Sequence, residues 1–145
     1  MFRYKCKIVK IIDGDTVDVD IDLGFGIWVR NERVRIHGID TPESRTSDKV
    51  EKQFGLLAKE FVKKMLPVGS KQTLCTEKAG DDSKGKFGRI LGKFEVYDGE
   101  TDSTMFLGDI MIREGHAVPY FGLSKADIQE QHLANRQKLH ERGVI

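Results

Sequence analysis

Hydrophobic and polar residues alternate along the first quarter of the chain in the manner of antiparallel strands. Residues 4–12 alternate loosely and then drift out of phase, which predicts a strand that bends or bulges. Residues 17–23 alternate strictly between apolar and aspartate positions, and a third strand follows with Val34 and Ile36 facing inward. The segments Asp13-Gly14-Asp15 and Gly24-Phe25-Gly26 carry the turn signals between these strands.

The period changes to three and four residues over 49–66, which predicts a helix that ends at Pro67-Val68-Gly69. Strands are predicted again at about 71–77 and 87–96, separated by a polar loop. A short helix is predicted at about 104–114, before Gly115. Ser124 and Asp127 form an N-cap pair for a last helix to about 142, whose apolar face consists of Ile128, Leu133 and Leu139.

Five strands of Greek-key length, with a helix between the third and fourth, predict a mainly β protein of the α+β class. The expected architecture is a five-stranded OB-fold Greek-key barrel with about three helices. At 145 residues, the chain is expected to form a single domain over 1–145. Cys6 and Cys75 have no metal-ligand spacing, so we interpret them as two separate strand residues, with a disulfide as the alternative.

The composition describes an ordinary globular protein, because 39% of residues are apolar and 32% are charged. A net charge of +1 lacks the strongly basic signature of many nucleic-acid-binding proteins. No apolar run is long enough to span a bilayer, and no signal peptide is visible. We therefore expect no membrane association and a cytoplasmic or phage- or mobile-element-encoded protein, or a secreted one if the sequence has been trimmed.

The residues from Arg35 to Glu43 hold the densest group of chemically useful side chains. Phosphodiester hydrolysis gathers negative charge, which a metal and arginines can stabilise while a carboxylate orients or deprotonates water. Asp15 follows a glycine turn and Asp40 ends a strand, so both carboxylates could share one Ca²⁺, with the Thr41 carbonyl as a third ligand. The four histidines are interpreted as structural or surface residues, since His132 and His140 have the wrong spacing for joint ligation on one helix face.

Two arginines could hold the phosphate, because a guanidinium contacts two phosphate oxygens at once. Arg35 lies on the non-core face of its strand, and Arg89 follows Gly88. Each arginine taken alone is more often a surface ion-pair residue, and Asp13-Gly14-Asp15 alone is usually a hairpin turn. The hypothesis of a phosphodiesterase therefore depends on their joint occurrence.

Three short motifs follow one another along the chain. They are Asp13-Gly14-Asp15-Thr16, then Arg35 followed after four residues by Asp40-Thr41-Pro42-Glu43, and then Lys86-Phe87-Gly88-Arg89. In this order and spacing they resemble the staphylococcal nuclease (thermonuclease) family. The resemblance continues in Ile112-Arg113-Glu114-Gly115-His116-Ala117 and Glu130-Gln131-His132-Leu133, so it covers nearly the whole chain. The resemblance implies an OB-fold, calcium-dependent endonuclease that acts on single- and double-stranded DNA and on RNA. It also implies release of the 5′ oxygen and 3′-phosphate products.

The resemblance also assigns roles to individual residues. Asp15, Asp40 and Thr41 would bind Ca²⁺, with Asp13 supporting the metal from behind. Glu43 would orient or deprotonate the attacking water, and Arg35 and Arg89 would clamp the phosphate. Lys86 and Tyr120 match positions near the bound nucleotide, although Gly85 stands where an acidic residue is expected and the segment around Tyr120 offers one tyrosine instead of two.

Two other function classes compete with a monomeric nuclease. The first is an OB module that binds nucleic acid or protein without catalysis, and the second is a protein that binds calcium only for structure. A binding module has no need for all of Asp15, Arg35, Asp40, Glu43 and Arg89, and a structural calcium site leaves both arginines without a purpose. The sequence therefore favours the enzyme.

Overall fold

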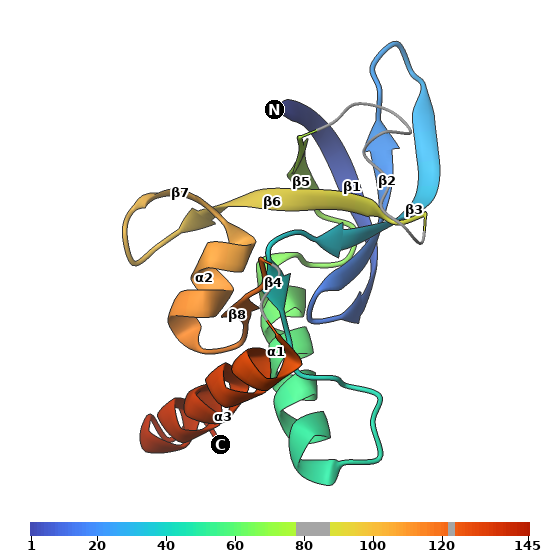
Figure 1. Ribbon diagram of the computed structural model, residues 1–145. Helices are drawn as coiled ribbons and strands as arrows, with labels where there is room; N and C mark the ends of the chain where they lie inside the picture. Colours follow the sequence, from blue (N-terminus) through green and yellow to red (C-terminus); the bar gives the residue numbers. More distant parts are fainter. Residues whose placement is uncertain (78–87, 122–123) are drawn as a thin grey trace.

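Five strands form a barrel that a parallel pairing closes (Figure 1). The computed structural model describes residues 1–77, 88–121 and 124–145. The barrel strands are β1 (Phe2–Asp13), β2 (Thr16–Asp22), β3 (Trp28–Ile36), β5 (Lys71–Thr76) and β6 (Ile90–Asp98). They are hydrogen-bonded in the order β3-β2-β1-β5-β6 with antiparallel neighbours, and β3 then pairs with β6 in parallel. This arrangement confirms the α+β class and the OB-like barrel.

The first strand bends as the loss of alternation predicted. Its register with β2 shifts between Ile8 and Lys10 and again between Ile11 and Asp13, where the turn into β2 begins. Bulges of this kind increase the local twist and let a strand follow the curve of a barrel. The turn therefore leaves Asp13 and Asp15 at one end of the barrel.

Within the described part of the chain, three helices lie at one end of the barrel, and the β2–β3 hairpin extends away from them (Figure 1). They are α1 (Lys49–Met65), α2 (Leu107–Glu114) and α3 (Lys125–Glu141). The Asp48 side chain caps α1 and the Ser124 hydroxyl caps α3, accepting from the backbone N–H of Asp127 as its N-cap pattern predicted. Gly115 ends α2 with φ of 84°, a left-handed conformation that glycine adopts without strain. Among the described residues, no helix has the length and apolar character needed to cross a membrane.

The structure corrects one of the predicted elements and adds two short strands. Residues 103–106 form a strand, β7 (Ser103–Phe106), which pairs with the end of β6 as a hairpin, so the short helix begins only at Leu107. The apolar spacing around Phe106 fitted a helix, but the hairpin supplies backbone partners that the spacing could not show. Two further strands of two residues each, β4 (Ile39–Asp40) and β8 (Val118–Pro119), also pair with each other.

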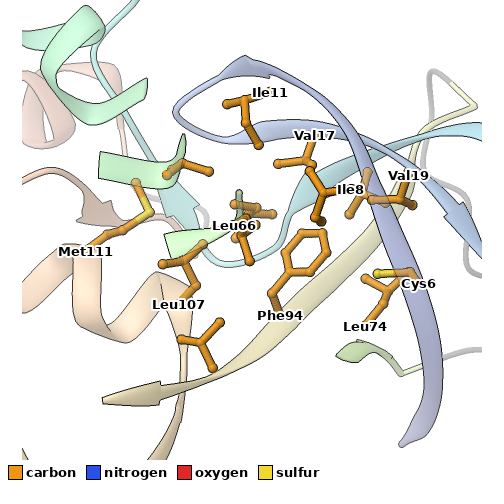
Figure 2. Packing of buried hydrophobic residues seen from close by; sticks show 14 of the residues in the cluster. Cys6, Ile8, Ile11, Val17, Val19, Leu66, Leu74, Phe94, Leu107 and Met111 are labelled. Atoms are coloured by element: carbon orange, nitrogen blue, oxygen red, sulfur yellow. The ribbon is translucent and has the colours of Figure 1, made fainter. Parts of the chain in front are cut away.

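One hydrophobic core fills the barrel and continues beneath the helices. Figure 2 shows the ring of Phe94 from β6 among side chains of β1, β2, α2 and the end of α1. Cys6 and Cys75 are buried free thiols in neighbouring strands, as interpreted from the sequence. On α3, however, the expected apolar residue Leu133 is 49% exposed, and His132 lies buried in its place.

Candidate active site

A cleft of about 460 Å³ gathers most of the predicted site residues. Those that line it are Arg35, Asp40, Thr41, Glu43, Arg89 and Tyr120. Helix α3 adds Lys125, Ile128, Gln129 and His132 to the wall, and α1 adds Glu51. The cleft therefore lies where β3, β4, the start of β6 and α3 meet.

The closure of the barrel brings the two arginines to one cleft. In the parallel pairing of β3 with β6, Arg35 lies opposite Leu91, two residues after Arg89. Gly88 has φ of 74° and turns the chain into β6 just before Arg89. Segments that are far apart in the sequence thus bring Arg35 and Arg89 to the lining of one cleft.

Arg35 is held by backbone carbonyls and lies between two carboxylates. Its Nη1 donates to the carbonyl of Ile36 at 2.7 Å, and its Nη2 donates to the carbonyl of Ile39 at 2.9 Å. The same Nη2 lies 3.5 Å from Asp15 Oδ2 and 4.0 Å from Asp40 Oδ1. Arg35 therefore fixes the loop that carries Asp40 and links the β1–β2 turn to β4.

The acidic side chains at this end of the barrel repel one another. Burial raises the pKa of Asp15, Arg35 lowers it, and the charges of Asp13 and Asp40 raise it further. Burial likewise raises the pKa of Glu43, and the charges of Asp13, Asp15 and Asp40 raise it too. The carboxylates whose charges raise the pKa of Asp15 and Glu43 form a negative field that a cation would relieve.

The donors present fit Ca²⁺ by their chemistry. Asp15 and Asp40 offer carboxylate oxygens close to one guanidinium, and Thr41 lies beside Asp40 with its hydroxyl buried and without a hydrogen-bond partner among the described residues. Ca²⁺ prefers such hard oxygen ligands. Within residues 1–77, 88–121 and 124–145, no three His, Cys, Asp or Glu side chains already lie close enough together to hold a metal.

Helix α1 presses against the backbone beside Glu43 through a glycine. A Cβ at Gly55 would collide with the Glu43 carbonyl group and would lie 2.6 Å from the backbone nitrogen of Ser44. Gly55 is buried inside α1, where glycine is otherwise a poor helix residue. This close approach therefore sets where the Glu43 backbone lies, and it explains a glycine that helix propensity disfavours.

The Gly55→Ala variant is expected to be less stable by about 1–3 kcal/mol, because a rigid backbone must move to admit the methyl group. The gain in helix propensity, about 1 kcal/mol, opposes this loss without removing it. Urea unfolding of the variant and of the wild type measures the difference. The matched control is Gly99→Ala, whose added methyl would meet nothing nearer than Tyr97 Cε1 at 4.0 Å. Equal stability of Gly55→Ala and wild type would contradict the close approach.

The remaining predicted residues differ in how the structure places them. Asp13 accepts a hydrogen bond from the backbone N–H of Gly14 at 3.0 Å. Its negative charge raises the pKa of Asp15 and of Glu43. Tyr120 is 46% exposed at the wall of the cleft, and its backbone N–H donates to the Gly38 carbonyl at 2.9 Å. Lys86 lies outside the described residues.

His132 is a site residue that interpretation of the sequence missed. Its Nε2 lies 2.7 Å from Asp40 Oδ2. From the sequence alone, all four histidines were interpreted as structural or surface residues. The available signal was its spacing, because His132 follows Ile128 by four residues and precedes Leu139 by seven, on the buried face of α3. A polar residue at a core-facing helix position indicates a partner across the interface.

Comparison with known proteins gives a family and several relatives. The family described as "Staphylococcal nuclease homologue" matches residues 33–142. An uncharacterized protein of Methanocaldococcus jannaschii is 25% identical over 98% of this chain and 70% of its own length. Endonuclease YhcR of Bacillus subtilis is 26% identical over 82% of this chain. A thermonuclease of Staphylococcus intermedius is 34% identical over 58% of this chain.

Two of these relatives are much longer than the matched region. The chain spans 9% of Endonuclease YhcR and 44% of the Staphylococcus intermedius thermonuclease. The matched part of the chain includes the cleft residues from Arg35 to His132.

Proposed function

The chain belongs to the staphylococcal nuclease family, and on that basis we propose that it is a calcium-dependent nuclease that hydrolyses phosphodiester bonds of DNA and RNA. The observation that carries the proposal is the cleft that Arg35, Asp40, Glu43 and Arg89 line together. The names of two relatives, Endonuclease YhcR and thermonuclease, support the same class of reaction. A module that only binds nucleic acid has no need for two arginines and several carboxylates around one cleft.

The residues of the cleft have complementary roles in the proposed reaction. Asp15, Asp40 and the Thr41 carbonyl would hold Ca²⁺, with Asp13 supporting them. When bound, the cation would supply positive charge beside the scissile phosphate. Arg35 and Arg89 would bind the phosphate oxygens and stabilise the added negative charge of the transition state.

Glu43 is proposed to orient the attacking water and to take its proton. The water oxygen forms a bond to phosphorus as the bond from phosphorus to the 5′ oxygen breaks. The departing 5′ oxygen takes up a proton, so the products are a 3′-phosphate and a 5′-hydroxyl. The raised pKa of Glu43 makes its carboxylate a better proton acceptor than an isolated glutamate.

The proposal predicts degradation of nucleic acid that a calcium chelator abolishes. Supercoiled plasmid, denatured DNA and RNA are incubated with the protein at alkaline pH in millimolar calcium and in excess EGTA, and the products are resolved on gels. New 3′ ends are expected to resist extension by a polymerase until a phosphatase has removed the terminal phosphate. A mock preparation from cells that carry the empty expression vector, purified in parallel, controls for contaminating nucleases.

Different failures would contradict different parts of the proposal. Degradation that EGTA leaves unchanged would refute the calcium dependence, and 3′ ends that extend directly would refute the product assignment. If no substrate is degraded, the enzyme assignment is wrong, and gel-shift binding would then favour the non-catalytic module.

A further inference from the structure

The Asp40 carboxylate lies between the side chains of two different elements, and only one of them is within hydrogen-bond distance. His132 Nε2 on α3 lies 2.7 Å from Asp40 Oδ2, and Arg35 Nη2 on β3 lies 4.0 Å from Asp40 Oδ1. An ionised carboxylate can only accept hydrogen bonds, so Nε2 carries the hydrogen and donates it. His132 itself is buried, with 7% of its surface exposed, whereas the Asp40 side chain is 32% exposed toward the cleft.

His132 also lines a second, much smaller cavity, together with residues of α1 and α3. The cavity has a volume of about 10 Å³, and His116, His132 and Arg136 are among the residues that line it. His116 Nδ1, His132 Nδ1 and Arg136 Nε are all buried and have no hydrogen-bond partner among the described residues. This volume, together with three polar atoms, suits one water molecule.

The hydrogen-bond chemistry of these three atoms is complementary. In neutral His132 with hydrogen on Nε2, Nδ1 is an acceptor, whereas Arg136 Nε is a donor. One water can accept from Arg136 and donate to His132, and it retains capacity for His116. The guanidinium carbon of Arg136 also lies 5.4 Å from the centroid of the Phe54 ring on α1, and both residues line the cavity.

The burial of His132 calls for a function, because an apolar residue would serve packing better. Its neighbours on the buried face of α3 are Ile128 and Leu139. Burying an imidazole costs free energy unless both ring nitrogens find partners. Asp40 provides one partner, and the cavity provides the place for the other.

We propose that His132 is a positioning residue for Asp40, with its Nδ1 bound to one buried water that Arg136 and His116 share. Helix α3 thereby orients a ligand of the proposed calcium site. The inference rests on the proposed function, since it takes Asp40 as a calcium ligand. Removing a residue that orients a metal ligand commonly lowers metal affinity about 10–100-fold.

Isothermal titration of the full chain with CaCl₂ tests the proposal through binding and not through activity. His132→Ala is expected to weaken calcium binding about 10–100-fold. His132→Gln is expected to recover most of this loss, to within about threefold of wild type, because its amide nitrogen can donate from nearly the position of Nε2.

Lys138→Ala is the matched control on the same helix. Lys138 donates to the Arg113 carbonyl at 3.0 Å, so its loss also loosens the attachment of α3 without touching Asp40. The calcium affinity of this variant is expected to stay within about twofold of wild type. Equal affinities for His132→Ala and Lys138→Ala would overturn the positioning role.

The titration also separates this inference from the proposed function. Wild type that binds calcium but cleaves no nucleic acid would refute the nuclease and leave the positioning role to be decided by the variants. Wild type that cleaves, with His132→Ala binding calcium equally well, would refute only the positioning role. Wild type that binds no calcium at millimolar concentration would refute both.

A second measurement on wild type does not depend on whether the variants fold. Long-range ¹H–¹⁵N spectra of the calcium-free protein are expected to show His132 with hydrogen on Nε2, and its ring signals are expected to shift in Asp40→Asn. Hydrogen on Nδ1 alone would contradict the contact. A crystal structure should show an ordered water within hydrogen-bond distance of His132 Nδ1 and Arg136 Nε, and a dry cavity would contradict the water.

Discussion

Replacing Glu43 with glutamine is expected to lower turnover of denatured DNA by about 10²–10⁴-fold, the range that general-base catalysis contributes. Glutamine keeps the shape of the side chain but cannot take a proton from water. Stability should not fall, because burial and the neighbouring carboxylates raise the pKa of Glu43. Its negative charge is therefore less stable in the folded protein than in the unfolded chain, and the neutral amide removes that cost. A loss of turnover with an unchanged or higher melting temperature is therefore the expected pair of results.

Glu51→Gln is the matched control for this prediction. Glu51 lines the same cleft from the first turn of α1, and its charge also acts on Glu43. Glu51 has no proposed role in activating the water. Loss of a general base costs at least about 10²-fold in rate, so replacing Glu51 is expected to change turnover by much less, under about tenfold. If Glu43→Gln and Glu51→Gln lost turnover to the same extent, turnover would depend on the total negative charge of the cleft and not on a general base at Glu43.

Arg89→Ala is expected to lower turnover by about 10²–10³-fold, as the loss of one transition-state donor commonly does. Arg89→Lys should recover only part of this, because lysine keeps the charge but loses the two-pronged contact with phosphate. Steady-state kinetics should show the loss mainly in kcat, since the proposed contact is strongest in the transition state.

Arg30→Ala serves as the control for Arg89→Ala. Arg30 is an exposed arginine that pairs with Asp20 at 3.1 Å and lies over the ring of Trp28, on the β2–β3 hairpin. Its loss should leave turnover unchanged. Near-full turnover by Arg89→Ala would refute the phosphate clamp even if the protein is a nuclease.

The barrel could be predicted from the sequence wherever local signals were strong. Alternation with aspartates marked β2, and the spacing of Phe54, Ala58 and Val62 marked α1, because each pattern matches the period of one element. The pattern around Phe106 did not identify a single element, because the same apolar spacing suits both the start of a helix and one face of a short strand. Its strand partner, the end of β6, is a tertiary feature that no local period reveals.

The candidate site was predicted only as far as each residue's own chemistry could reveal it. Arginine, aspartate and glutamate in a short segment indicate phosphate and cation chemistry, and the structure brings Arg35, Asp40 and Glu43 to one cleft. His132 was missed because a histidine on a helix has many uses, and its partner Asp40 lies on β4. Contacts between distant segments require the fold before they can be recognised.

The parallel pairing of β3 with β6 also bears on how the chain reaches its native state. It joins residues 34–36 to residues 90–92, so closing this long loop costs more chain entropy than forming the β1–β2 hairpin. Long-range pairings of this kind slow folding. Because Arg35 lies within the pairing and Arg89 directly precedes it, a compact intermediate with its hairpins and α1 formed would still lack an assembled cleft. In a newly made chain, the two arginines therefore meet only when the barrel closes, so an incompletely folded chain has no complete phosphate-binding site.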